Sequence, residues 1–287
     1  IFGGLAGFLG ALVLSTAFLF WDSARFARSD MLLTFFITLS VSLIIVGSIQ
    51  ERRSGIFMVG AFMGAALGMM SKGPVGFVLP GLVSFFYLTF CKRWLRFPGW
   101  SYALGVVSFL AIILPWYWAY AHVAGGEHLW EMLFRQNVTR YLSAFDHRNP
   151  LYFYVGYFPP NFIPWVGLVM VALVYGVSRN WRKRDPATLV IIWWACVFFF
   201  FSLSTSKRPS YILPAFPPAA LLTGHFLDAK VFIKGTEDWL IWRRLGFWIF
   251  ALTFVGMIIG GVGFPIWAAL AEPRLFSSSV SIGILFV

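Results

Sequence analysis

The sequence predicts an all-α fold, a polytopic bundle of transmembrane helices. Of its 287 residues, 60% are hydrophobic and only 11% are charged, and the mean hydropathy is +0.80. Soluble domains carry about 25% charged residues, so this composition is typical of a chain that folds in lipid. Backbone groups in hydrocarbon must find partners within their own segment, and helices are therefore the expected elements.

Apolar stretches separated by short polar turns run along the whole chain. A helix needs about 20 apolar residues to cross a bilayer. The expected spans are residues 1–20, 31–49, 55–70, 75–90, 101–119, 161–178, 187–203, 211–227, 245–268 and 278 onward. The spans 55–70 and 75–90 are short, so we expect them to be tilted or to use flanking residues. Residues 1–287 are expected to form a single transmembrane domain, and because the chain begins and ends inside apolar runs, we interpret it as a fragment.

Basic residues alternate between two sets of turns. Thirteen lie in the turns near residues 52, 93, 182 and 237, and nine lie in the intervening turns. The positive-inside rule assigns the richer set to the cytoplasm. Most of the net charge of +11 is then topological, and no nucleic-acid partner is expected. The nine basic residues on the outer side indicate a site there for an anionic ligand carried in the membrane.

The longest polar stretch, residues 120–160, is expected on this outer side. Within it, 128–141 has the pattern of an amphipathic helix lying along the outer leaflet. Its apolar residues are Leu129, Met132, Leu133 and Val138, and its polar residues are Glu131, Arg135, Gln136 and Arg140. The aromatic and proline-rich segment 152–165 suits an interfacial belt that leads back into the bilayer.

Asp30 is the first candidate site residue. It opens the span 31–49 directly after Arg28 and Ser29. A carboxylate at the outer membrane face is suited to orienting or deprotonating a nucleophile, or to binding an amine. The alternative is structural, because Ser29 or Asp30 would also be a good N-cap for the helix.

Three cations and a phenol are the candidates for binding phosphate. Lys72 lies in the turn Ser71-Lys72-Gly73-Pro74 between two apolar spans, where it either contacts a phosphate at the following helix start or extends to lipid headgroups. Lys207 and Arg208 precede a segment interrupted by prolines, and such broken helices usually line a cavity. Two cations with the phenol of Tyr211 suit a phosphate or pyrophosphate.

The polar stretch 120–160 adds five further candidates for contacts with a ligand. They are Arg135, Asn137, Arg140, His147 and Arg148. The spacing of His147 from Glu127 and His128 is not that of a zinc site, so we expect solvated loop residues there, and neither a metal nor another cofactor.

Taken together, several motifs resemble one family. They are Ala24-Arg25-Phe26-Ala27-Arg28-Ser29-Asp30, Ser71-Lys72-Gly73-Pro74, the loop 131–165 with His147-Arg148-Asn149-Pro150 and Pro164-Trp165, and Lys207-Arg208-Pro209-Ser210-Tyr211-Ile212-Leu213-Pro214. In this order they resemble the bacterial aminoarabinose transferases, which modify lipid A. That family is grouped with the protein O-mannosyltransferases among the polyprenyl-phosphate-dependent glycosyltransferases of the GT-C fold. The resemblance covers about residues 24 to 218.

The resemblance implies a glycosyltransferase of the bacterial inner membrane whose active site faces the periplasm. It would move a sugar, such as 4-amino-4-deoxy-L-arabinose, from undecaprenyl phosphate to a lipid or protein acceptor at the outer leaflet, such as lipid A. Asp30 matches the family's second acidic position, and the first lies upstream of Ile1. One departure is the pair Gln136-Asn137, where many relatives carry Glu-His, and it leaves the sugar and acceptor open.

Two other interpretations of the cations remain. One is a transporter or flippase of a lipid-linked anion, which broken helices and buried cations also suit. Such a protein would show inverted repeats and cations near the bilayer midplane, whereas here the cations cluster at one interface. The other is a scaffold that binds anionic lipid through its outer loops, and cations scattered towards solvent would favour it.

Overall fold

Helices form the regular elements throughout the part of the chain that the structure describes. The structure is a computed structural model, and it describes residues 2–26, 28–143, 147, 149–180, 186–232 and 239–271. The all-α class predicted from composition is confirmed. In chain order the α-helices are α1 (Gly4–Thr16), α2 (Phe18–Arg25), α3 (Ser29–Ile49), α4 (Ser54–Lys72), α5 (Val75–Phe90), α6 (Gly99–Ala124), α7 (Gly126–Trp130), α8 (Arg140–Leu142), α9 (Phe153–Tyr157), α10 (Val166–Asn180), α11 (Pro186–Leu203), α12 (Phe216–Phe226) and α13 (Trp239–Ala271).

Shorter helical elements connect them. The 3₁₀ helices are η1 (Glu51–Arg53), η2 (Trp94–Arg96), η4 (Pro160–Phe162) and η5 (Pro209–Ala215), and the π-helices are η3 (Glu131–Thr139) and η6 (Leu227–Phe232).

The helices form a multi-pass membrane bundle, and the ten expected spans are matched only roughly. Among the described residues, α3, α4, α6 and the part Ile241–Gly263 of α13 are long and apolar enough to cross a membrane. The number is six if each of two bent pairs, α1 with α2 and residues 153–162 with α10, is counted as one span. The helices α5 and α11 are apolar but shorter. The tenth expected span, from residue 278 onward, lies outside the described residues.

The first expected span, 1–20, is broken rather than straight. Ala17 has an extended backbone (φ −69°, ψ 128°), and the axes of α1 and α2 differ by 65°. The amide of Phe18 donates to the carbonyl of Ile163 at 3.0 Å, and the indole Nε1 of Trp165 donates to Thr16 Oγ1 at 2.7 Å. Hydrogen bonds to the segment 163–165 are thus made at the point where the helical hydrogen bonds of a straight span are interrupted.

The expected span 211–227 also has an irregular start. Its first part is the 3₁₀ helix η5, and the α-helix begins only at Phe216. Pro209, Pro214, Pro217 and Pro218 have no N–H to donate, so a regular ladder of helical hydrogen bonds is not available here. The segment still packs tightly, because Ile212, Leu213 and Phe216 are fully buried.

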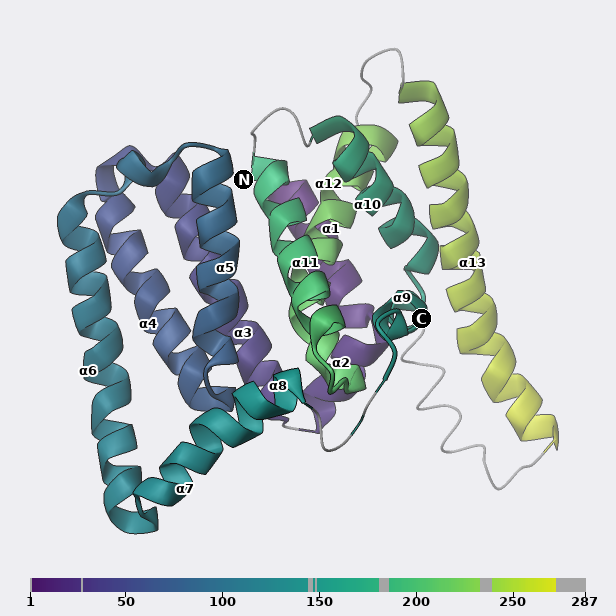
Figure 1. Cartoon of the computed structure of the whole chain (residues 1–287). Coiled ribbons are helices and arrows are strands. Elements are labelled where there is room, and N and C mark those ends of the chain that lie inside the picture. The colour runs from purple at the N-terminus through teal and green to yellow at the C-terminus, as the bar shows by residue number, and fades with distance from the viewer. Residues whose placement is uncertain are drawn as a thin grey trace.

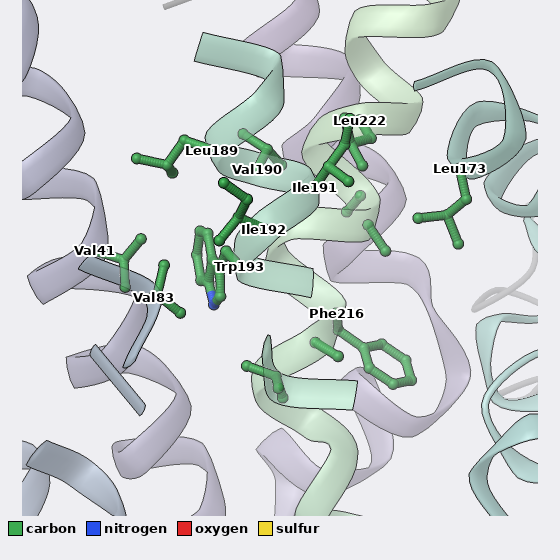
Figure 2. Close-up of a cluster of buried hydrophobic side chains, with 14 of the residues drawn as sticks. Val41, Val83, Leu173, Leu189, Val190, Ile191, Ile192, Trp193, Phe216 and Leu222 are labelled. Atoms are coloured by element: carbon green, nitrogen blue, oxygen red, sulfur yellow. The ribbon is translucent and has the colours of Figure 1, made fainter. Parts of the chain in front are cut away.

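The core joins two groups of helices through α11. Figure 1 shows α3 to α6 on one side and α1, α10 and α12 on the other, with α13 at the outer edge. Figure 2 shows side chains of α11, among them Ile192 and Trp193, beside Val41 and Val83 of the first group. Because α11 contacts both α5 and α12, it fixes how the two groups meet.

The two ends of the bundle carry the two predicted sets of turns. The start of α3, the α4–α5 turn, the rod formed by α7, η3 and α8, and the α11–η5 loop lie at one end, and η1 and η2 lie at the other (Figure 1). The alternation predicted from the basic residues therefore agrees with the arrangement of the described helices. The candidate site residues are gathered at the first of these ends.

Candidate functional site at one end of the bundle

A cavity of about 540 Å³ opens at the end of the bundle where the candidate residues gather. Its walls come from α3, the α4–α5 turn, the end of α6, the η3–α8 rod and the α11–η5 segment. Its polar lining includes Asp30, Ser71, Lys72, Gln136, Asn137, Arg140, Tyr141, Ser204, Ser206 and Tyr211, and its apolar lining includes Leu33, Met69, Met70, Val75, Val78, Met132, Phe200 and Phe201. A polar patch beside apolar walls suits a ligand with a charged head and a hydrocarbon chain.

Asp30 faces this cavity from the first turn of α3. The N-cap position of α3 is Arg28, and no side chain caps the helix there. The buried Asp30 carboxylate instead accepts a hydrogen bond from the ammonium group of Lys72, with which it forms an ion pair. The carboxylate thus links α3 to α4.

Lys72 is the last residue of α4, where a cation is favoured by the helix dipole. Gly73 follows it with φ 83°, a left-handed conformation that glycine adopts freely and that turns the chain into α5. The Lys72 Nζ atom lies 4.4 Å from the centroid of the Tyr211 ring, a cation–π contact worth roughly 0.5–2 kcal/mol. Three groups on three different elements therefore hold one another at the cavity wall: Asp30, Lys72 and Tyr211.

Three cations gather near this wall. Arg140 and Arg208 are close enough to Lys72 for their charges to act on its ammonium group. The carboxylate of Asp30 is already paired with Lys72. Cations gathered beside one cavity suit an anionic ligand.

The expected amphipathic helix 128–141 is present as α7, η3 and α8. The pattern predicted an apolar side lying along the outer leaflet, and in the structure Leu129, Met132 and Leu133 pack against a small cluster around Ala66 and Tyr117. Val138, the fourth residue of that apolar side, is 46% exposed and lines the cavity. The π-helical geometry of η3 has a wider turn than an α-helix, and it brings two successive amides, Gln136 and Asn137, to the cavity.

Asn137 packs directly on the α4–α5 turn. A Cβ atom added to Gly73 would lie 3.1 Å from both the Nδ2 and the Oδ1 atoms of Asn137. The Asn137 Nδ2 donates to the carbonyl of Met132 at 2.8 Å. The amide is thus fixed beside Lys72 by its own helix and by a glycine that leaves room for it.

The C-terminal end of the rod is tied to the end of α11. Arg140 Nε lies 3.4 Å from Ser206 Oγ, and the Tyr141 hydroxyl donates to the carbonyl of Phe200 at 2.9 Å. Burial raises the pKa of the Tyr141 hydroxyl, so the group keeps its proton and remains a donor. Arg140 is thereby held at the lining of the same cavity as Lys72.

Lys207 is placed differently from what its charge predicts. It is only 3% exposed and is not among the residues that line the cavity. Its ammonium group donates to the carbonyls of Asn149, at 3.1 Å, and of Ser204. Burial lowers the pKa of this ammonium group.

The remaining candidates lie around the site rather than in its lining. The carbonyl of Arg208 accepts a hydrogen bond from the Tyr154 hydroxyl at 2.8 Å. Arg135 pairs with Glu131 at 2.8 Å on the exposed face of η3, and the carbonyl of His147 accepts the amide of Lys207 at 3.0 Å. Arg148 lies outside the described residues.

Several lining residues were not anticipated from the sequence. They are Trp116, Tyr117, Phe200, Phe201 and Ser204. The only local signal at α6 is Pro115 inside an apolar helix, and such a proline marks a bend without telling which side chains line a cavity. Four consecutive phenylalanines make the end of α11 apolar on every side, so its hydrophobic pattern does not indicate which side lines a cavity.

The chain is similar in sequence to one protein family and to several known proteins. Residues 1–118 match the family described as dolichyl-phosphate-mannose-protein mannosyltransferase. A Pseudomonas aeruginosa (strain UCBPP-PA14) protein named undecaprenyl phosphate-alpha-4-amino-4-deoxy-L-arabinose arabinosyl transferase is 31% identical over 77% of this chain and 40% of its own length. A protein of the same name from Enterobacter sp. (strain 638) is 25% identical over 95% of this chain and 50% of its own length.

The fold was also found among solved structures. The crystal structure of ArnT from Cupriavidus metallidurans bound to undecaprenyl phosphate matches with a TM-score of 0.70 and 21% identity, over 99% of this chain and 57% of that one. The chain thus spans about half the length of the relatives that it matches. In sequence this chain is similar to proteins named as aminoarabinose transferases and, over residues 1–118, to the mannosyltransferase family, and it has the fold of ArnT; this is the resemblance that its motifs predicted.

Proposed function

We propose that this chain is the membrane core of a glycosyltransferase that takes its sugar from a polyprenyl phosphate. The observation that carries the proposal is that Lys72 and Arg140 line one cavity, with Arg208 close enough for its charge to act on Lys72. A lipid phosphate needs cations at its head and apolar surface for its chain. The names of the sequence relatives, and the ligand of the solved ArnT structure, give independent support.

In the proposed reaction, an acceptor oxygen attacks the anomeric carbon of the sugar. The bond between that carbon and the phosphate oxygen breaks, and polyprenyl phosphate leaves with both electrons of the bond. Lys72 and Arg140 stabilise the negative charge that develops on the leaving phosphate, an electrostatic contribution to catalysis. Asp30, paired with Lys72, orients the acceptor hydroxyl and takes up its proton as the new bond forms.

We assign the cavity to the periplasmic face of a bacterial inner membrane. The excess of basic residues in the opposite turns supports this orientation by the positive-inside rule. The acceptor would then be a lipid or protein at the outer leaflet, with lipid A as the first candidate. Gln136 and Asn137, at the position where many relatives carry Glu-His, both line the cavity, so the sugar must be established by comparing donors.

The first prediction tests donor binding. Replacing Lys72 by Met in the full-length protein should weaken the binding of undecaprenyl phosphate about tenfold or more, since charge-assisted contacts are worth roughly 1.5–3 kcal/mol and a factor of ten is about 1.4 kcal/mol. Lys92→Met is the matched control, because Lys92 is an exposed lysine in a turn at the opposite end of the bundle. Titration of both variants in one detergent makes the comparison.

Transfer to lipid A or to a simple acceptor, followed with several sugar-loaded polyprenyl phosphates, then tests the activity itself. Equal affinities of the two variants would contradict the assigned phosphate site. If the donor crosses proteoliposome membranes and no sugar is transferred, the protein is a flippase and not a glycosyltransferase.

A further inference from the structure

Lys207 is buried at the junction of two loops. It lies between the end of α11 and the start of η5, and its ammonium group donates to the carbonyl of Asn149, at 3.1 Å, and to that of Ser204. The first acceptor belongs to the segment before α9 and the second to the segment after α11. A buried ammonium group is tolerated only when such acceptors replace its water.

Backbone and amide bonds reinforce the same junction. The amide N–H of Lys207 donates to the carbonyl of His147 at 3.0 Å, and the Nδ2 atom of Asn149 donates to the carbonyl of Lys207 at 3.1 Å. The amide of Thr205 donates to the carbonyl of Tyr141 at 2.9 Å. The segment 205–207 is thus held between the end of the η3–α8 rod and residues 147 and 149.

The junction leads directly to a cavity residue. The amide of Tyr211 donates to the carbonyl of Arg208 at 3.1 Å, and the Tyr154 hydroxyl donates to the same carbonyl at 2.8 Å. The Tyr211 ring in turn lies against the Lys72 ammonium group at 4.4 Å. The path from Lys207 to the cation at the cavity wall therefore consists of short contacts between neighbouring groups.

We propose that Lys207 is a positioning residue, which clasps the loop containing Asn149 to the α11–η5 segment and so holds Tyr211 against Lys72. It does this without touching the ligand, because its ammonium group is used by two carbonyls and lies off the cavity lining. The inference rests on the proposed function for its effect on transfer, but the clasp itself is a property of the lipid-free protein.

Hydrogen exchange of the full-length protein without any lipid tests the clasp. The Lys207→Met variant keeps the aliphatic stem and loses the two ammonium bonds, so the amides of residues 205 and 207 should exchange at least about tenfold faster. Lys207→Arg should restore much of the protection, because a guanidinium group also donates to two carbonyls. Lys92→Met, which removes an exposed charge, should leave these amides unchanged.

A second variant separates positioning from phosphate binding. Asn149→Ala removes the amide donor to Lys207 without removing any charge, and it also suits the case in which Lys207→Met fails to fold. We expect it to lower sugar transfer in the same direction as Lys207→Met, with the double variant little worse than either single one, because both changes open one junction.

The results that would overturn the clasp are equally definite. Unchanged exchange in lipid-free Lys207→Met would show that there is no clasp, and a tenfold loss of affinity for undecaprenyl phosphate with full activity of Asn149→Ala would show that Lys207 binds the phosphate instead of positioning Tyr211. If the unmodified full-length protein transfers no sugar, the proposed function fails, and the exchange measurements still decide whether the clasp exists.

Discussion

Asp30 and Lys72 come from the first turn of α3 and the last residue of α4, and their pairing sets the charge that a ligand meets. The sequence left Asp30 with two roles, a helix cap or a group facing a ligand. The structure shows no side-chain cap at α3 and an ion pair with Lys72 instead. The pair lies at the wall of the cavity, only partly exposed, with side-chain exposures of 25% for Lys72 and 11% for Asp30.

A second prediction follows from this pairing. Replacing Asp30 by Asn removes the negative charge beside Lys72, so the variant should bind undecaprenyl phosphate at least as tightly as the unmodified protein. It should nevertheless transfer sugar at least about tenfold more slowly, since positioned acid–base groups contribute typically 10²–10⁴-fold. Binding by titration and transfer at saturating donor measure the two effects separately. Weaker binding with unchanged transfer would show that Asp30 serves only to hold Lys72 in place.

At the scale of helices, a close approach between α4 and α5 supports the site. A Cβ atom on Gly76 would lie 2.1 Å from the backbone carbon of Gly68 and 2.4 Å from the amide nitrogen of Met69. No real Cβ contact is that short, so the two backbones touch only because residue 76 is glycine. This contact lies one turn from Lys72, and it fixes the direction in which the lysine leaves α4.

The third prediction compares two glycines of α5, Gly76 and Gly81. Gly76→Ala should force α4 and α5 apart, lowering stability by about 1–3 kcal/mol, the usual cost of overpacking, and lowering donor affinity with it. Gly81→Ala is the control, because a Cβ atom at Gly81 would meet nothing within 4 Å. Thermal unfolding in detergent compares the two. Equal melting temperatures would mean that the α4–α5 contact is easily relaxed.

The sequence patterns predicted the helices and turns better than they predicted contacts between segments that are far apart in the chain. The positions of Asp30, Lys72, Asn137, Arg140 and Tyr211 at one cavity follow from alternating charge and short turns, since both are local properties of the chain. The environment of Lys207 has no such signature, because its partners are backbone carbonyls of two distant segments. The same holds for the bend at Ala17, which depends on a hydrogen bond to Ile163.

At the scale of the whole molecule, the two ends of the bundle have different characters. One end carries the cavity and the α7–η3–α8 rod, and the other carries the turns η1 and η2 (Figure 1). The basic residues predicted this separation, because topology is set by charge. They did not predict that α11 would lie between two groups of helices, since a helix that is apolar on every side gives no signal of which face packs where.

The last prediction tests the sidedness of the whole molecule. In a background with Cys91 and Cys196 replaced by Ser, a single cysteine is introduced at Thr139, which is exposed on η3, or at Leu95, which is fully exposed on η2. With the cavity facing the periplasm, a membrane-impermeant maleimide added to intact spheroplasts should label Thr139→Cys. It should label Leu95→Cys only after the membrane is permeabilised. The reverse pattern would place the cavity in the cytoplasm, where the positive-inside rule would have failed for this chain. Labelling of both sites in intact cells would mean leaky membranes, which a cytoplasmic marker enzyme measured in the same samples reveals.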